Sequence, residues 1–382
     1  MQRDTYLGSI RNYFNSHPIV ALVGPRQCGK TTLARQFAKQ STEVHFFDLE
    51  DSRDQAALKN PHLAFGDLSG LIIIDEIQRL PELFPTLRVL VDERRDRRFL
   101  ILGSASRDLI KQSSETLAGR IAYIEVHPFS LLEVPNITQL HLLGGFPSSY
   151  LYPETAFRWL EQYIRTFLEQ DIPNLGFSIP AVTMRRFWTM LAHYHANTFN
   201  ASEIGRSLGI SDHTVKNYLD ILSGTFMVRQ LYPWFANIGK RQTKKPKIYF
   251  CDSGIFHHLM DIHSHEQLLK NPKFGASFEG FALEQVIRIF DKRTEDCYYW
   301  GIHQEGELDL LIFHQGQKIG FEFKVNDAPS ATSSMYKAIE YLNLDKLYVI
   351  YPGIKTYKLS EHIEVLPLKN LASIAGTKKI TS

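Results

Sequence analysis

Residues 18–38 read PIVALVGPRQCGKTTLARQFA, and this stretch decides the fold of the first part of the chain. A run of apolar residues predicts a buried β-strand, a glycine-rich loop follows, and apolar residues at helical spacing then predict a helix. Gly24, four further residues and then Gly29-Lys30-Thr31 form the complete spacing of a phosphate-binding loop. Glycines let backbone N–H groups curl around a phosphate, and the positive end of the following helix faces it.

This loop predicts a site for ATP. Lys30 is expected to reach the β- and γ-phosphates, and Thr31 to place its hydroxyl on Mg²⁺. The residues expected to line the nucleotide are those of the loop and the first helical turn: Gly24, Pro25, Arg26, Gln27, Cys28, Gly29, Lys30, Thr31 and Thr32.

A second motif, LIIIDEIQ, occupies residues 71–78. Its four apolar residues predict a parallel strand that is buried on both faces. Asp75 at the end of this strand is expected to hold Mg²⁺, and Glu76 to polarise the water that attacks the γ-phosphate. An acidic strand end that caps the next helix has the same pattern, but beside a complete glycine loop we favour the catalytic interpretation.

Composition limits the class of protein. The chain has 382 residues, too many for one ordinary core, and 44% hydrophobic with 22% charged residues indicates a globular protein. Its three cysteines form no CxxC pair and no even disulfide framework, which favours a reducing, cytoplasmic location. The apolar runs are far shorter than the roughly 18 residues of a membrane span. The net charge of +2 means that any nucleic-acid surface must be a local patch.

A helix-turn-helix is predicted in the middle of the chain. Asn200 with Glu203 three residues later signals a helix start. Gly209 ends that helix, and Ser211 caps the next one. The predicted strands FMVRQLYPW and PKIYFC follow, with the basic segment GKRQTKKPK between them, so the unit is typical of a winged helix.

Side chains that suit contacts with phosphates and base edges are expected to face outward from this winged helix. They are His213, Lys216 and Asn217 on the second helix, and Lys240, Arg241, Lys244, Lys245 and Lys247 in the wing. We favour DNA as their partner. Winged helices also serve as protein-contact modules, and that alternative stays open.

Two adjoining strands are predicted in GELDLLIFHQGQKIGFEFK, residues 306–324. Asp309, twelve intervening residues and then Glu322-x-Lys324 is the spacing of restriction-endonuclease-like sites. In such sites Asp and Glu hold one or two Mg²⁺ ions while Lys orients the attacking water. Strand alternation places Glu322 and Lys324 on one face.

Glu279 is expected to complete this metal site with Asp309 and Glu322, from the helix predicted for FGASFEGFALEQVIRIF. Glu284 lies five residues further along and roughly 140° around that helix, so Glu279 is preferred. Charged residues set inside otherwise buried strands favour an endonuclease-like fold. They do not decide between a cleaving enzyme and a binding platform.

With these regions in view, the chain resembles a broad bacterial and archaeal family of AAA+-type ATPases. Members pair the ATPase with a winged helix and a C-terminal restriction-endonuclease-like domain of unknown function. The resemblance extends over residues 5–368 and rests on GPRQCGKTTLA, IIIDEIQ, LILGSAS, LAGRIAYIEVHPFS, GGFP, YIRTFLEQDI, NIGKRQTKKPKIYFCDSG, FEGFALEQ and ELDLL…FEFK. It implies binding of ATP and Mg²⁺ by Lys30, Thr31, Asp75 and Glu76.

The resemblance implies two further catalytic residues. In AAA+-type ATPases a polar residue at the end of the strand RRFLILGS, here Ser104, senses the γ-phosphate and orients the water. Arg120 precedes the fifth strand, where ring-forming ATPases carry an arginine finger that enters the neighbouring subunit's site. Arg107 is the reserve candidate. Alternatively, Arg120 is a surface arginine that satisfies carbonyls at a helix end.

The fold class expected is α/β with three domains: a P-loop AAA+-type parallel-sheet ATPase (1–135), a helical winged-helix domain (136–260) and an α/β restriction-endonuclease-like domain (261–375). The function expected is an ATP-hydrolysing, Mg²⁺-dependent motor of the branch-migration or translocase type on duplex or branched DNA. We expect a homo-oligomer, preferably a hexamer, without membrane association. Two alternatives stay open: an ATP-gated DNA endonuclease, and an ATP-dependent regulatory switch that binds protein partners.

Overall fold

The computed structural model describes residues 3–104, 113, 115–235, 244–302 and 305–376. The chain forms two compact units, Met1–Pro128 with Gly224–Phe226, and Phe129–Ser223 with Met227–Ser382. The expected middle and C-terminal domains therefore share one unit, because strands from both hydrogen-bond within one sheet.

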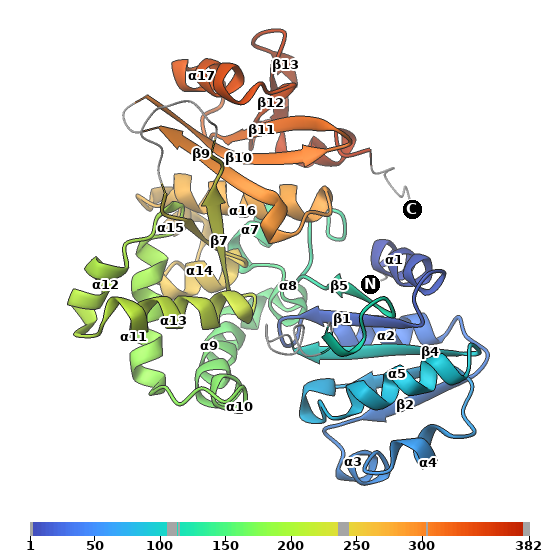
Figure 1. Ribbon diagram of the computed structural model, residues 1–382. Helices are drawn as coiled ribbons and strands as arrows, with labels where there is room; N and C mark the ends of the chain where they lie inside the picture. The colour runs from blue at the N-terminus through green and yellow to red at the C-terminus, as the bar shows by residue number, and fades with distance from the viewer. Residues whose placement is uncertain (1–2, 105–112, 114, 236–243, 303–304, 377–382) are drawn as a thin grey trace. The chain divides into compact units, whose positions relative to one another are not determined.

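A five-stranded parallel sheet forms the centre of the first unit, in the strand order β2-β3-β4-β1-β5 (Figure 1). Ile19, Ala21 and Val23 of β1 pack in one apolar cluster, and Val20 and Leu22 pack in another. Both faces of the sheet are therefore buried, as the uninterrupted apolar runs predict. The strands are β1 (Ile19–Gly24), β2 (Val44–Asp48), β3 (Gly70–Asp75), β4 (Arg97–Ser104) and β5 (Ile121–Glu125).

Helices cover each face of this sheet. Leu33 of α2 (Lys30–Ala38) and Leu7 of α1 (Asp4–Phe14) belong to the cluster of Val20, whereas Leu87 of α5 (Leu83–Glu93) belongs to the cluster of Ile19. Two short helices, α3 (Ser52–Ala57) and α4 (Pro61–Phe65), connect β2 to β3. Because all five strands are parallel, the loops that follow β1, β3 and β4 all lie at the carboxyl ends of the strands.

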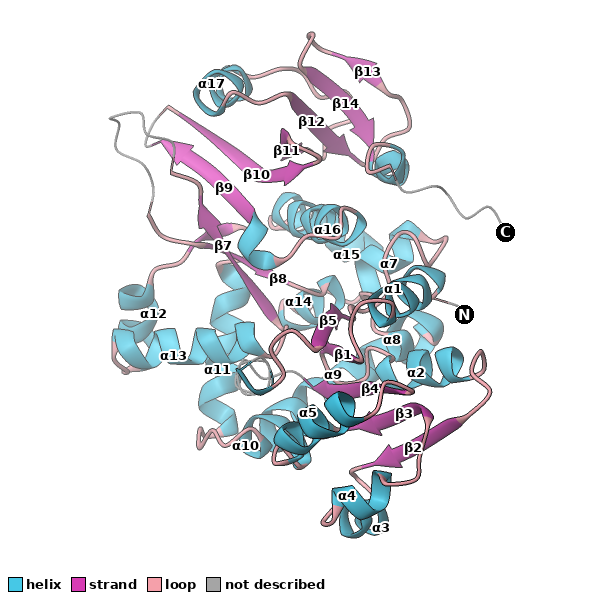
Figure 2. Ribbon diagram, turned by 45° about the vertical axis from the view of Figure 1, so that its right-hand side comes forward, coloured by secondary structure: helices cyan, strands magenta, loops and turns pink. Residues whose placement is uncertain are grey.

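The second unit contains a nine-stranded sheet in the order β13-β14-β12-β11-β10-β9-β7-β8-β6 (Figure 2). Its strands are β6 (Asn197–Thr198), β7 (Val228–Pro233), β8 (Lys247–Phe250), β9 (Cys297–Ile302), β10 (Gly306–His314), β11 (Gln317–Phe323), β12 (Lys346–Tyr351), β13 (Tyr357–Lys358) and β14 (Ile363–Pro367). A short parallel pairing of Tyr232 with Tyr298 and Pro233 with Tyr299 joins β7 to β9. This pairing links the hairpin β7–β8 to the C-terminal strands.

Helices of the second unit contribute to several apolar clusters, one of which includes Phe187, Trp188 and Phe250. They are α7 (Ile137–Leu143), α8 (Pro147–Leu151), α9 (Ala156–Thr166), α10 (Ile172–Asn174), α11 (Ala181–His193), α12 (Ala201–Leu208), α13 (Asp212–Gly224), α14 (Ser253–Leu259), α15 (His265–Lys270), α16 (Phe274–Ile289) and α17 (Ser333–Leu342). Among the described residues, no helix combines the length and apolar character that crossing a membrane requires.

The turn between α12 and α13 forms as its residues predict. Gly209 adopts a left-handed conformation at φ 70°, which glycine reaches without steric cost, and it ends α12. The hydroxyl of Ser211 accepts a hydrogen bond from the backbone N–H of Thr214 at 3.1 Å and so caps α13. The two helices thus lie on either side of a tight, capped turn.

Candidate functional site

The phosphate loop joins β1 to α2, and two of its glycines are required by the backbone path. Gly24 has φ 155°, and a Cβ atom there would collide with the carbonyl oxygen of Val126. Gly29 has φ 98° immediately before α2. Any larger residue would strain the loop at both positions.

Lys30 lies at the centre of this loop. Its ammonium donates hydrogen bonds to the carbonyl oxygens of Gly24 at 3.0 Å and Pro25 at 2.8 Å, and the residue is only 6% exposed. The loop therefore holds a buried positive charge beside the N-terminal end of α2, which also favours negative charge. This is the electrostatic setting that a phosphate requires.

Thr31 and Asp75 meet although they come from separate parts of the chain. The Thr31 hydroxyl donates to the Asp75 carboxylate at 2.7 Å, and the second carboxylate oxygen accepts from the Glu76 backbone N–H at 3.0 Å. Hydroxyl and carboxylate oxygens are the ligands that Mg²⁺ prefers, and it commonly uses only one or two from the protein. The residues at this position therefore fit a Mg²⁺ ion.

Glu76 directly follows β3 with a left-handed backbone, at φ 55°. Its carboxylate accepts a hydrogen bond from the Gln78 side-chain amide. Burial raises the pKa of both Asp75 and Glu76 above the ordinary carboxylate value. A raised pKa makes Glu76 a stronger base than an exposed glutamate, which suits a group that polarises water.

Ser104 is at the end of β4, which lies between β1 and β3 in the sheet. Its backbone is in register with Gly24, the first residue of the phosphate loop. Its side chain lies outside the described residues, as does the whole of Arg107. The sheet thus places residue 104 between the phosphate loop and Glu76, at the edge where the strands end.

Arg120 lies at the opposite end of the strands, immediately before β5 begins. Ile121, the first residue of β5, pairs with Ile19, the first residue of β1, and the Arg120 carbonyl accepts from the Ile19 N–H at 3.1 Å. The phosphate loop begins only after the six residues of β1, about 20 Å further along the strand direction. Arg120 is therefore out of reach of the phosphate loop of its own chain.

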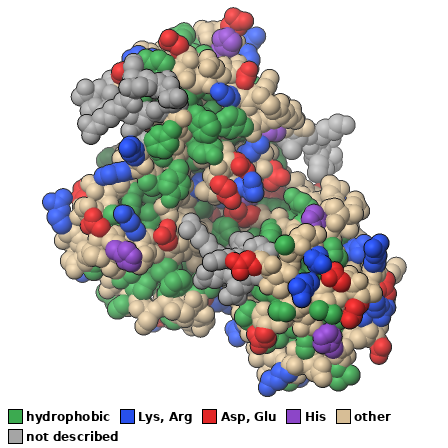
Figure 3. Space-filling view, in the orientation of Figure 1, with side chains coloured by type: hydrophobic (Ala, Val, Ile, Leu, Met, Phe, Trp, Pro, Cys, Tyr) green, Lys and Arg blue, Asp and Glu red, His purple; other side chains and the backbone are tan. Residues whose placement is uncertain are grey.

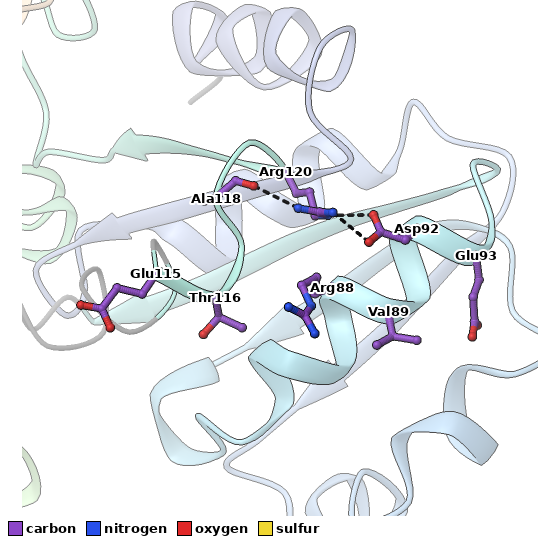
Figure 4. Close-up of a pocket in the computed structure, with 8 residues that line it drawn as sticks. All are labelled: Arg88, Val89, Asp92, Glu93, Glu115, Thr116, Ala118 and Arg120. Carbon is purple, nitrogen blue, oxygen red and sulfur yellow. Dashed lines mark hydrogen bonds and ion pairs between the residues drawn. The ribbon is translucent and has the colours of Figure 1, made fainter.

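A bidentate ion pair holds the Arg120 side chain in place (Figure 4). Its Nε and Nη2 donate to the two carboxylate oxygens of Asp92 at 2.7 and 2.9 Å, and Nη1 donates to the Ala118 carbonyl at 3.1 Å. The hydrogen bond from Arg120 lowers the pKa of Asp92. The guanidinium remains partly exposed and borders a surface pocket of about 500 Å³, lined by Arg88, Val89, Asp92, Glu93, Glu115, Thr116, Ala118 and Arg120.

The residues expected to contact DNA fall into three groups. His213, Lys216 and Asn217 are exposed on α13, and Lys244 and Lys245 are exposed before β8. Positive and negative side chains are interspersed over the face shown in Figure 3, in keeping with the net charge of +2. Lys240 and Arg241 lie outside the described residues. Lys247 forms the third group.

Lys247 was expected to face outward in the wing, and this prediction is wrong. The residue is the first of β8 and is 5% exposed. Its ammonium forms ion pairs with Glu307, with Glu279 at 3.7 Å and with Asp309 at 3.7 Å. It is therefore unavailable to a phosphate, because its charge is already paired within the fold.

The three carboxylates expected to bind metal do converge, in the second unit. The register of β10 with β11 pairs Leu310 with Phe321, which places Asp309 beside Glu322, and Glu279 reaches the same place from α16. The Lys324 ammonium donates to Glu322 at 2.8 Å. Burial raises the pKa of Glu279 and of Glu322. We call Glu279, Glu307, Asp309 and Glu322 with Lys247 and Lys324 the carboxylate cluster.

Comparison with known proteins places the whole chain in a family. It is 44% identical over 385 residues to the uncharacterized proteins Rv2008c of Mycobacterium tuberculosis and Mb2031c of Mycobacterium bovis, covering 100% of this chain and 87% of each relative. The chain belongs to their family. Residues 16–134 match the model of an AAA domain, and residues 134–266 and 274–371 match two domains of unknown function, DUF8612 and DUF4143.

Two solved structures align with part of this chain at low sequence identity. The Walker-type ATPase PABY2304 of Pyrococcus abyssi aligns with a TM-score of 0.46 at 16% identity, over 68% of this chain and 95% of that one. A point variant of Thermotoga maritima RuvB aligns with a TM-score of 0.32 at 17% identity, over 60% and 90%. The first unit of this family member is an AAA-type ATPase domain, and its fold implies nucleotide binding.

The carboxylate cluster does not fit a metal ion as it stands. Lys247 places a positive charge beside Glu279 and Asp309, and a divalent cation held by the same oxygens would be repelled by it. Within the described ranges, no group of three or more His, Cys, Asp or Glu side chains is arranged to hold a metal. The sequence alone did not predict the burial of Lys247, because this residue ends a basic segment that is typical of a solvated wing.

Glu284, the acid not preferred for the metal site, belongs to a separate buried ion pair. Arg229 donates from Nε and Nη2 to its two oxygens at 2.6 and 3.1 Å, and both side chains are 3% exposed. Arg288 lies 3.7 Å from the same carboxylate. Glu284 is thus engaged in an ion pair separate from the carboxylate cluster.

Replacing Glu284 by alanine is expected to destabilise the second unit by about 3–5 kcal/mol, because it leaves the Arg229 guanidinium buried without its carboxylate. Urea unfolding followed by circular dichroism measures the loss. The matched control is Glu266→Ala, which removes the exposed partner of Lys270 and is expected to change stability by less than about 1 kcal/mol. Equal effects of the two substitutions would contradict the prediction.

Proposed function

We propose that this protein is an ATP-hydrolysing, Mg²⁺-dependent motor that acts on duplex or branched DNA as a homo-oligomeric ring, preferably a hexamer. The position of Arg120 carries the proposal. Arg120 lies at the end of the strands opposite its own phosphate loop. It can therefore complete an ATP site only in a second copy of the chain. Hydrolysis is then coupled to assembly.

Each residue of the ATP site has a distinct part in this proposal. Lys30 binds the β- and γ-phosphates, Thr31 and Asp75 hold Mg²⁺, and Glu76 polarises the attacking water. When bound by Thr31 and Asp75, Mg²⁺ would neutralise negative charge on the phosphates. Ser104 orients the water from the end of β4. Arg120 of the neighbouring copy, aligned by Asp92, stabilises the transition state.

The segment from α11 to β8 acts as a winged helix in this proposal. Its order of helix, short strand, two helices and hairpin supports the assignment, as does the pairing of β8 with both β6 and β7. α13 presents His213, Lys216 and Asn217 to DNA, and the exposed lysines before β8 contact phosphates. Phosphate contacts of this kind give affinity without sequence preference.

The segment from α16 to β12 has a restriction-endonuclease-like order in this proposal: helix, three antiparallel strands, helix and parallel strand. We assign it to recognition of DNA structure and not to cleavage, because the carboxylate cluster does not fit a metal ion.

Reversing two exposed charges, in Lys244→Glu/Lys245→Glu, is expected to reduce the salt dependence of DNA binding. Each lost phosphate contact removes about 0.9 from the slope of log K against log salt concentration, so the slope should fall by roughly 1.8. Fluorescence anisotropy with a labelled duplex at several salt concentrations measures it. Lys358→Glu, an exposed lysine on β13, is the control. An unchanged slope in the double variant would argue against DNA contact there.

A labelled four-way junction tests the proposed function as a whole. Purified protein, Mg²⁺ and ATP are incubated with the junction, and products are run on native and denaturing gels. We expect intact strands to separate, to be lost in Lys30→Ala and to persist in Asp309→Asn. Failure to separate junction or duplex strands, with ATP turnover intact, would refute the motor. Shortened strands that disappear in Asp309→Asn would instead establish an endonuclease.

A further inference from the structure

Lys247 is a buried lysine in the middle of the carboxylate cluster. Its ammonium lies 3.7 Å from Glu279 Oε1 and 3.7 Å from Asp309 Oδ1. It forms an ion pair with Glu307. It also lies 5.5 Å from the centre of the Tyr299 ring. A lysine is almost never this buried unless its charge is paired, so the contacts explain why β8 can bring it inside.

At least one oxygen of each carboxylate that would bind a metal already has a partner from this chain. Tyr249 donates its hydroxyl to Glu279 Oε1 at 2.6 Å, and the Phe323 backbone N–H donates to Asp309 Oδ2 at 3.0 Å. Lys324 donates to Glu322 Oε2 at 2.8 Å. With Lys247 beside Asp309 Oδ1, each of the three carboxylates is engaged by at least one donor of this chain.

Positive charge from this chain already faces these carboxylates without a metal. Asp309 and Glu322 are buried and Glu279 is partly buried, the ammonium groups of Lys247 and Lys324 face them, and Glu307 is half exposed and reaches solvent. The ion pairs thus place the Lys247 ammonium where a shared cation would lie.

We propose that Lys247 is the resident cation of the carboxylate cluster: its ammonium takes the place of a divalent metal ion between Glu279 and Asp309, and the site excludes metal. The ion pairs then fasten β8, and with it the end of the basic segment, to the C-terminal strands. The inference is independent of the ATPase and concerns only the second unit.

Direct counting of bound Mn²⁺ by electron paramagnetic resonance, without nucleotide, tests this proposal in full-length proteins. We compare the wild type, Asp309→Asn, Lys247→Met and Lys247→Met/Asp309→Asn, so that any Mn²⁺ at the phosphate loop is common to all four. Lys247→Met is expected to bind one Mn²⁺ per chain more than the wild type, and Asp309→Asn in that background is expected to remove it. Lys247→Arg keeps the positive charge and is expected to gain none.

Two results would overturn the proposal. One is a wild type that loses one Mn²⁺ per chain on Asp309→Asn, since the cluster would then bind metal with Lys247 present. The other is a folded Lys247→Met that gains none, since Lys247 would then not be standing in for a metal. If Lys247→Met does not fold, the first comparison decides: equal Mn²⁺ counts in the wild type and Asp309→Asn support metal exclusion, and unequal counts refute it.

Discussion

Arg120→Ala is expected to lower the rate of ATP turnover by roughly 10³–10⁵-fold, the range of a trans-acting arginine finger in GTPases, while leaving ATP binding unchanged. The residue lies about one strand length from its own phosphate loop, so its loss does not disturb the pocket where ATP binds. In the proposed ring, the substitution removes a positive charge that would stabilise the transition state in the neighbouring copy. Steady-state turnover and binding of a fluorescent ATP analogue measure the two effects separately.

Mixing two inactive variants tests whether Arg120 acts between copies. Lys30→Ala lacks a working phosphate loop but retains Arg120. Arg120→Ala retains the phosphate loop but lacks the arginine. Some sites in a mixed ring therefore combine an intact loop from one copy with Arg120 from its neighbour. Turnover should reappear in the mixture. Arg88→Ala removes a neighbouring exposed arginine from the same pocket and controls for a general loss of surface charge. Normal turnover in Arg120→Ala, or a mixture with no activity although mixed rings form, would exclude the finger.

Glu76→Gln is expected to lower the rate of hydrolysis by roughly 10²–10⁴-fold, the usual contribution of a general base, and to keep ATP affinity. Glutamine has the same shape and can retain the contact with Gln78, but it cannot accept a proton from water. Single-turnover hydrolysis isolates this step from product release. Glu82→Gln, an exposed glutamate just before α5, is the matched control.

The pH dependence of the same rate provides a second check on Glu76. In the proposed mechanism hydrolysis needs the ionised carboxylate of Glu76, and burial raises the pKa of this residue. Activity should therefore fall with decreasing pH at a higher pH than an ordinary glutamate would give. In Glu76→Gln this acidic limb should be absent from the residual activity. A limb that persists unchanged in the variant would assign the base to another residue.

The sequence alone determined the features that depend on neighbouring residues. The strand, glycine loop and helix of residues 18–38 are all present, and the glycines stand where the backbone needs them. Gly209 and Ser211 likewise end one helix and begin the next as predicted. In each case the physical cause is local: backbone freedom, a cap or an apolar period acts over a few residues.

Only the tertiary structure decided which distant side chains share a site. The order and direction of the strands decide that Arg120 and the phosphate loop lie at opposite ends of the parallel strands. For Lys247, the basic run indicated solvent, yet the pairing of β7 with β9 connects its hairpin to the strand neighbouring that of Asp309. A buried ion pair depends on desolvation and on partners far along the chain, and no local pattern records either.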